Sequence, residues 1–152
     1  MVTSDSRRAG ELAVAARRDL ALAELAELPA SRYAAAHLAA LRAAAAVLAA
    51  RPPSVEAPVS SRGKATARRR RPASAWDQLP VVAPELGAWA ARFAAGAAKR
   101  AAAEAGFRDA VDRTEADELL AAARTFVALV EAALEVERPP IFGAGSAGSL
   151  AG

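Results

Sequence analysis

The segment SRYAAAHLAALRAAAAVLAAR, residues 31–51, limits the fold more than any other part of the sequence. Ser31 is a typical N-cap residue, and Pro29 before the segment and Pro52-Pro53 after it mark its ends. Apolar residues recur within it at three- and four-residue steps and place one narrow apolar face on a helix: Leu38, Leu41, Ala45 and Leu48. The segment therefore predicts one long helix, against which other helices must pack.

The composition also favours helices over strands. Alanine, which has the highest intrinsic helix propensity, supplies 47 of the 152 residues, whereas valine and isoleucine are scarce. A chain of this length is typical of one domain. The composition thus predicts a single all-α domain.

Besides the helix at residues 31–51, we expect three further long helices, one before it and two after a long central connection. The first covers residues 7–28 and forms an antiparallel hairpin with residues 31–51, because only a short turn through Pro29 joins them. Ser74 and Asp77 have capping-box spacing and predict a short helix, which Pro80 and Pro84 should interrupt.

The later helices have similar signals at their ends. One should run from Pro84 to about Ala105, with Gly106 as its C′ residue. The other should cover residues 115–137, capped by Thr114 and Asp117. Its buried stripe is expected to contain Leu119, Ala123, Phe126, Val130 and Ala133.

Together these helices predict an up-down-up-down four-helix bundle over residues 7–137. Alanine faces bury little area, so the core should depend on its few large side chains. These are Trp76, Trp89, Phe93, Phe107 and Phe126. The small core also favours association with a second helical chain, and a homodimer is the expected form.

Residues 52–73 are rich in proline, serine and arginine and show no periodicity, so we expect a long disordered loop between the second and third long helices. The tail, residues 138–152, is also expected to be disordered. The net charge is +3, and six basic residues between Pro58 and Trp76 leave −3 for the rest. The run Arg68, Arg69, Arg70 and Arg71 is a candidate nucleic-acid contact, and a solvated linker is the plainer interpretation.

Several classes of site are missing from the sequence. There is no cysteine and only one histidine, so we expect no transition-metal site, and carboxylate pairs lie only where solvated charge is ordinary. Phosphate-binding glycine motifs are absent, and we expect no cofactor. The N-terminus lacks the apolar segment of a signal peptide, and Arg42 interrupts the best membrane candidate, so we expect a cytoplasmic protein without a membrane span.

Arg32 and His37 are the remaining candidates for chemistry. An imidazole can exchange a proton with the ribose of RNA near neutral pH, and a guanidinium can hold the phosphate, without a metal. Five residues along a helix place the two side chains about 140° apart, so they do not share a face. A catalytic pair should therefore open onto a groove or a dimer cleft, whereas a buried His37 would favour a structural role.

The segment containing this pair resembles the second helix of HEPN (higher eukaryotes and prokaryotes nucleotide-binding) domains. SAWDQLPVVAPELGAWAARFAAGAAKRAAAEAG and TEADELLAAARTFVALVEA are similar to small stand-alone members of that family. The resemblance implies a helical bundle that commonly dimerises. Many such domains are metal-independent ribonucleases with an R-x4-6-H motif, matched here by Arg32 and His37, and they recur in toxin–antitoxin and defence systems.

Three functions stay open at this point. The resemblance implies an RNA-cleaving or RNA- or nucleotide-binding protein, with a cognate regulator protein as a partner in toxin–antitoxin systems. A non-catalytic helical dimerisation or interaction module is the alternative. Nucleic-acid binding through the run Arg68–Arg71 is the third.

Overall fold

The computed structural model describes residues 3–52 and 74–137. Within these residues every regular element is helical and none is a strand, which confirms the all-α class. The α-helices are α1 (Ser4–Leu25), α2 (Pro29–Ala50), α4 (Ala75–Val82), α5 (Gly87–Ala95), α6 (Ala97–Glu104) and α7 (Arg113–Glu137). Two 3₁₀ turns, η2 (Pro84–Leu86) and η3 (Arg108–Ala110), join the later helices. The predicted loop beyond Pro52, with Arg68–Arg71, and the predicted tail lie outside the described residues.

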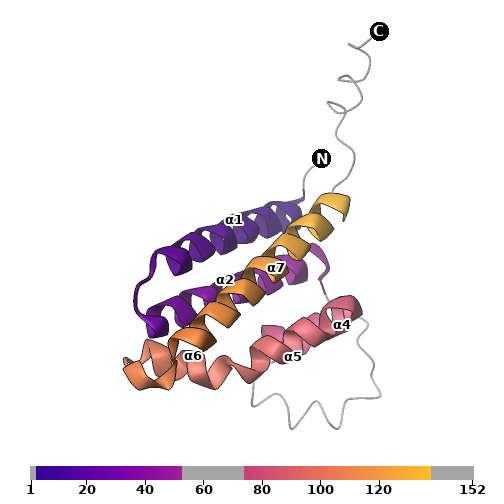
Figure 1. Ribbon diagram of the computed structural model, residues 1–152. Helices are drawn as coiled ribbons and strands as arrows, with labels where there is room; N and C mark the ends of the chain where they lie inside the picture. Colours follow the sequence, from indigo (N-terminus) through magenta and orange to yellow (C-terminus); the bar gives the residue numbers. More distant parts are fainter. Residues whose placement is uncertain (1–2, 53–73, 138–152) are drawn as a thin grey trace, which may run out of the picture.

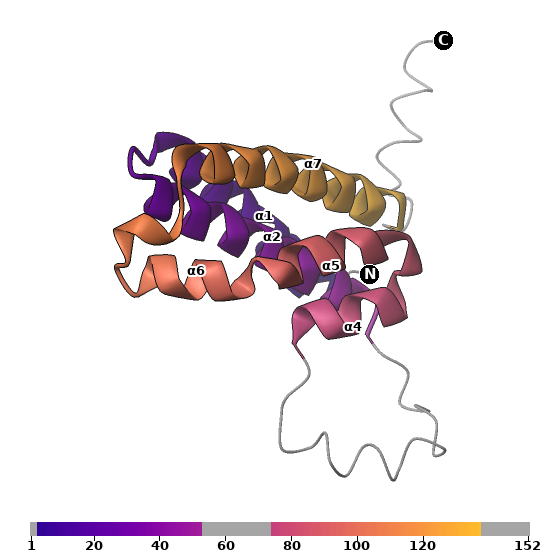
Figure 2. The same cartoon turned by 60° about the horizontal axis from the view of Figure 1, so that its bottom comes forward.

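The helix α2 is the central element of the fold. It packs against α1, α7, α4 and α6. The long helices α1, α2 and α7 lie together, while α5 and α6 follow one another along a further side (Figures 1 and 2). Where a single long third helix was predicted for the bundle, the structure has a series of short ones.

The junction between α1 and α2 lies earlier in the sequence than predicted. The helix α1 ends at Leu25, and α2 begins at Pro29, with Leu28 as the N-cap residue in place of Ser31. Proline suits the first helical position because its φ angle is preset and its missing N–H would have no partner there. The predicted antiparallel hairpin is present, and the two helices pack along their length.

The helix α4 has the predicted capping box, but it is not interrupted at Pro80 as predicted. The Ser74 hydroxyl accepts from the Asp77 N–H at 3.1 Å, and the Asp77 carboxylate accepts from the Ser74 N–H at 3.3 Å. Pro80 lies inside α4 and does not end it. The helix tolerates this proline at the cost of one backbone hydrogen bond in a short element. Pro84 begins the 3₁₀ turn that follows.

The predicted helix 84–105 is divided at Gly96 into α5 and α6. A Cβ atom on Gly96 would lie 2.6 Å from the Tyr33 hydroxyl oxygen, so any other residue there would have to displace this side chain between α2 and the α5–α6 segment. At the end of α6, Gly106 has a φ of 93° and is the predicted C′ residue. Its N–H donates to the Ala103 carbonyl and the Phe107 N–H to the Ala102 carbonyl, each at 3.1 Å.

The helix α7 has the predicted buried stripe but a different cap. Asp112 and Glu115 form the capping box: the Asp112 side chain accepts from the Glu115 N–H at 2.8 Å, and the Glu115 side chain accepts from the Asp112 N–H at 3.1 Å. The same three-residue spacing two positions later had favoured Thr114 and Asp117. The predicted stripe is buried, except that Ala133 is only half-buried.

An aromatic cluster fills the space between α2, α4, α5 and α7. The Phe93 ring is fully buried, and its centroid lies 5.2 Å from those of Trp76 and Phe126. Trp89 stacks on Phe93 at 6.2 Å but is only half-buried, less than predicted. Phe107 is 66% exposed and does not belong to the core, because it follows the Gly106 turn. The core therefore rests on three of the five predicted aromatic side chains, with Trp89 at its edge.

The buried face of α2 is made of alanine. Its fully buried small residues include Ala36, Ala40, Ala43 and Ala44, whereas the predicted leucine face is only half-buried. Short side chains let α1 and α7 approach α2 closely, which the leucines would prevent. Among the described residues, α2 alone is long and apolar enough to cross a membrane, although Arg42 interrupts it. Half of that apolar window is buried in the fold, as in the core helix of a soluble protein, so this is weak evidence for a span.

Candidate functional site

Arg32 closes the junction between α1 and α2. Its guanidinium donates to the carbonyls of Ala23 and Ala26 at 3.2 and 2.9 Å and to Asp117 of α7 at 2.6 Å. The last carbonyls of a helix have no intrahelical partner and form the negative end of its dipole, so a cation is well placed there. The Arg32 side chain thus ties the end of α1 to the start of α7.

His37 lies inside the aromatic cluster and is 1% exposed. Its Nε2 is 2.8 Å from the Phe93 carbonyl oxygen. Because a carbonyl only accepts, Nε2 carries the proton, and Nδ1 is the unprotonated nitrogen of a neutral ring. Nδ1 has no hydrogen-bond partner among the described residues. The rings of Trp76 and Phe93 meet the imidazole edge-on at 5.9 and 6.1 Å.

Burial lowers the pKa of His37 below its ordinary value, because the charged ring would lose its solvation. The nearby Arg100 charge lowers this pKa further, while the hydrogen bond to Phe93 and the Glu104 charge raise it. The ring is therefore held neutral in a closed apolar site.

The structure does not bring Arg32 and His37 together. Arg32 reaches the α1–α2 turn and Asp117, whereas His37 points between α4 and α5. The imidazole does not open onto a groove in this chain. The candidate contacts Arg68–Arg71 lie outside the described residues.

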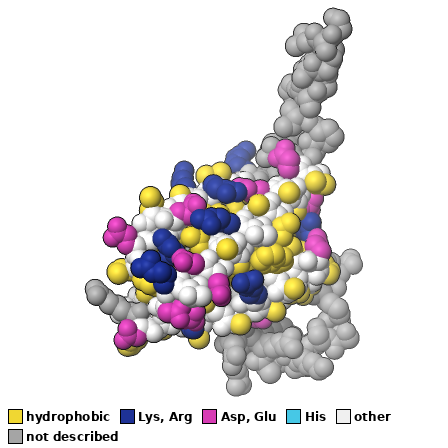
Figure 3. Space-filling model, viewed as in Figure 1, with side chains coloured by type: hydrophobic (Ala, Val, Ile, Leu, Met, Phe, Trp, Pro, Cys, Tyr) yellow, Lys and Arg dark blue, Asp and Glu magenta, His cyan; other side chains and the backbone are white. Residues whose placement is uncertain are grey.

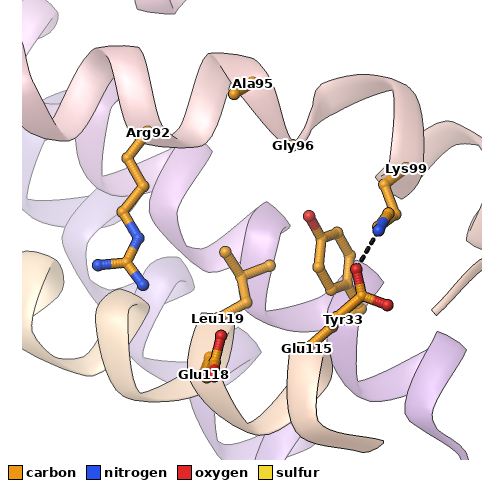
Figure 4. A pocket seen from close by; sticks show the side chains of 8 residues that line it. All are labelled: Tyr33, Arg92, Ala95, Gly96, Lys99, Glu115, Glu118 and Leu119. Atoms are coloured by element: carbon orange, nitrogen blue, oxygen red, sulfur yellow. Dashed lines mark hydrogen bonds and ion pairs between the residues drawn. The ribbon is translucent and has the colours of Figure 1, made fainter. Parts of the chain in front are cut away.

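A pocket that the sequence did not indicate lies one turn from His37. It has a volume of about 260 Å³ and is lined by residues of α2, α5, α6 and α7 (Figure 4). These are Tyr33, Arg92, Ala95, Gly96, Lys99, Glu115, Glu118 and Leu119. A glycine inside an alanine-rich helical segment was the only local signal, since it indicates a close approach by another group.

Tyr33 is a nearly buried polar residue in the lining of this pocket. The residue is 6% exposed, and its hydroxyl points toward Gly96 (Figure 4). No described residue makes a hydrogen bond to that hydroxyl. Burial raises the pKa of Tyr33 above its ordinary value, so the phenol stays protonated at neutral pH and can donate.

The charges around the pocket are of both signs. Lys99 and Glu115 form an ion pair, which raises the pKa of Lys99 and lowers that of Glu115. Arg92 and Glu118 make no ion pair or hydrogen bond with any described side chain. In the described part of the chain, no group of three or more histidine, cysteine or acidic side chains is placed to hold a metal ion.

A family model of SAV_6107-like HEPN domains matches residues 23–131 of this chain. The chain belongs to the HEPN family. Searches among curated proteins and among solved structures gave no match. The matched part of this HEPN domain begins near the end of α1 and ends within α7, so it includes Arg32, His37 and every residue of the pocket.

The HEPN domain also presents an apolar stripe along α2. Its members follow one another at four- and three-residue steps and are all half-buried: Ala34, Leu38, Leu41, Ala45 and Leu48. The adjacent Arg42 is neutralised by Asp19 of α1, whose carboxylate oxygens lie 2.9 and 3.2 Å from its guanidinium. Ala34 and Leu41 also pack partly against the core, and the charged side chain next to the stripe is paired.

Proposed function

We propose that this HEPN-family chain is a non-catalytic helical interaction module and that its partner is a second copy of itself. The observation that carries the proposal is the environment of His37, whose ring is closed off from solvent and hydrogen-bonded to the Phe93 carbonyl. We therefore infer that Arg32 and His37 of the R-x4-H motif stabilise the fold and do not take part in catalysis.

A general base must come within about 2.6–3.2 Å of the proton that it removes. The proton-bearing nitrogen of His37 already has a backbone partner, and the other nitrogen lies in the closed aromatic site. Arg32 likewise directs its donors to three carbonyls at the C-terminal end of α1 and to Asp117. RNA cleavage would require both side chains to leave these partners.

The apolar stripe of α2 is suited to pairing with itself. Its residue sizes run small, large, large, small, large from Ala34 to Leu48. If two copies of α2 cross antiparallel about a twofold axis at Leu41, Ala34 meets Leu48 and Leu38 meets Ala45. Every layer away from the axis then combines one alanine with one leucine, as interdigitated packing between helices requires.

The charges next to the stripe permit this pairing. Burial of an unpaired charge at an interface is strongly unfavourable. Arg42 is the charged residue within the run from Ala34 to Leu48, and it already binds Asp19. A homodimer through α2 would therefore bury apolar surface and leave an ion pair intact at its rim.

A swap of two residues tests this interface. Sedimentation equilibrium should show that the wild type is a dimer. Ala45→Leu should weaken the dimer because it places two leucines in each of two layers, and Leu38→Ala should weaken it because it leaves two alanines there. The double variant Leu38→Ala/Ala45→Leu restores one alanine and one leucine in each layer and should recover the dimer. Leu25→Ala, at an exposed residue of α1, is the matched control and should have no effect.

Two results would contradict the proposal in different ways. A monomeric wild type, or a double variant no better than the single ones, would exclude the α2 interface. Cleavage of mixed RNA by the wild type in EDTA, lost in a folded His37→Gln variant, would exclude the non-catalytic role. Circular dichroism of each variant shows whether the fold is intact.

A further inference from the structure

The pocket beside Tyr33 has three polar groups without protein partners in the described part of the chain. They are the Tyr33 hydroxyl, the Arg92 guanidinium and the Glu118 carboxylate. The tyrosine is the most informative, because its residue is 6% exposed and what remains accessible includes a hydroxyl that faces the pocket without a protein partner among the described residues. Gly96 keeps the space next to it open, since a Cβ atom there would meet the hydroxyl at 2.6 Å.

The charges of the pocket select the kind of ligand. Lys99 and Glu115 neutralise each other, which leaves one cation, Arg92, and one anion, Glu118. A simple anion would be repelled by Glu118, and a simple cation by Arg92. Ala95 and Leu119 add an apolar surface, and in Figure 4 the Leu119 side chain lies between Arg92 and Tyr33.

The geometry points to a binding site for a small zwitterion of the amino-acid type. The Arg92 guanidinium and the Tyr33 hydroxyl donate hydrogen bonds to the carboxylate of the ligand, and Glu118 binds its ammonium group. A short methylene chain between the two charges contacts Leu119. A volume of about 260 Å³ suits a ligand of this size, below the range typical of drug-sized molecules. This site is separate from the α2 stripe, so the inference does not depend on dimer formation.

The probes are three ω-amino acids with increasing charge separation: glycine, 4-aminobutanoate and 6-aminohexanoate. Butanoate and butylamine carry only one of the two charges and are the matched controls. The chain has a single tyrosine, so a protein labelled with ¹³C-tyrosine gives one set of ring signals that reports on Tyr33 directly. We expect one or more of the ω-amino acids to shift these signals saturably in the millimolar range or below.

Variants then assign the contacts. Arg92→Gln and Glu118→Gln should each weaken binding of the zwitterion roughly tenfold or more, because each removes a charge-assisted contact. Arg18→Gln and Glu11→Gln on the exposed side of α1 are the matched controls and should not change it. In Tyr33→Phe the ring packing is kept and the hydroxyl is lost, and weaker binding should be seen in the Gly96 amide signal.

The outcomes separate clearly. The proposal is overturned if no ω-amino acid moves the Tyr33 signals of the folded protein, or if butanoate or butylamine binds as tightly as the zwitterions. It is also overturned if Arg92→Gln and Glu118→Gln bind like the wild type. Selective binding of a zwitterion that both variants weaken supports it.

Discussion

Two polar side chains on the same side of α2, Tyr33 and His37, lie one turn apart and are both almost fully buried. The His37 ring donates to a backbone carbonyl and is surrounded by aromatic rings, whereas the Tyr33 hydroxyl faces a pocket and has no partner among the described residues. Both residues contact the same turn at the end of α5. The Phe93 carbonyl accepts from His37, and Gly96 leaves room for the Tyr33 hydroxyl.

The comparison shows that burial alone does not distinguish structural from ligand-binding residues. What differs is whether the protein itself supplies a partner for the polar atom. His37 matches a catalytic motif in sequence, yet its donor is already used within the fold. Tyr33 matches no motif, and its hydroxyl is available.

The largest effect on stability should come from truncating Phe93, whose ring packs against His37. Phe93→Ala should reduce the free energy of unfolding by about 3–5 kcal/mol, because Phe93 is fully buried between Trp76 and Phe126. Urea unfolding followed by circular dichroism measures this value. Trp89→Ala, at the half-buried edge of the cluster, should cost less, and an equal or larger cost would contradict the described core.

A smaller effect on stability is expected from Gly96→Ala, and its sign should depend on whether residue 33 is tyrosine or phenylalanine. Gly96→Ala should destabilise the protein by about 1–3 kcal/mol, because its Cβ atom would lie 2.6 Å from the Tyr33 hydroxyl and the mostly buried tyrosine would have to shift. In a Tyr33→Phe background the nearest ring carbon lies 3.6 Å away, an ordinary contact. There the substitution should stabilise by up to about 1 kcal/mol, since alanine favours a helix more than glycine does.

Urea unfolding of the four proteins in this cycle measures the coupling between the two positions. If Gly96→Ala has the same effect with tyrosine and with phenylalanine at position 33, the close approach between them is wrong.

The smallest effect should appear on acidification. The pKa of His37 is lowered in the folded protein relative to about 6.5 in the unfolded chain, so the unfolded state binds more protons as the pH falls. The stability linked to His37 is therefore fully present above about pH 6.5 and is lost as the pH falls through the lowered folded-state pKa. Urea unfolding across this range should show the slope for the wild type. His37→Gln, whose amide can still donate to the Phe93 carbonyl but does not titrate, should lack it, and an equal slope in both would contradict the assignment.

Much of the secondary structure could be predicted from local signals. The capping box of Ser74 and Asp77 and the C′ residue Gly106 depend on a few neighbouring residues, and the structure has both. Thr114 and Asp117 have the same spacing as Asp112 and Glu115, so local reasoning could not choose between the two caps. The all-α class followed from the alanine content and the helical periodicity.

The site could not be predicted because it depends on contacts between distant residues. On α2 the periodicity favoured the leucine face, but the neighbouring helices bury the alanine face, because its short side chains let the helices approach closely. The close approach of Tyr33 to Gly96 divides a helix that appears continuous in the sequence. The motif spacing of Arg32 and His37 gives their separation along the helix and says nothing about the Phe93 carbonyl or Asp117, which determine their environment.

The protonation state of His37 separates a structural histidine from a catalytic one. The chain has a single histidine, so histidine-selective ¹⁵N NMR reports on this residue alone. We expect a neutral ring with the proton on Nε2, a pKa below 6.5, and no change of its signals when RNA oligonucleotides are added. A histidine that titrates at or above pH 6.5, or whose signals shift on addition of RNA, would contradict the structural role.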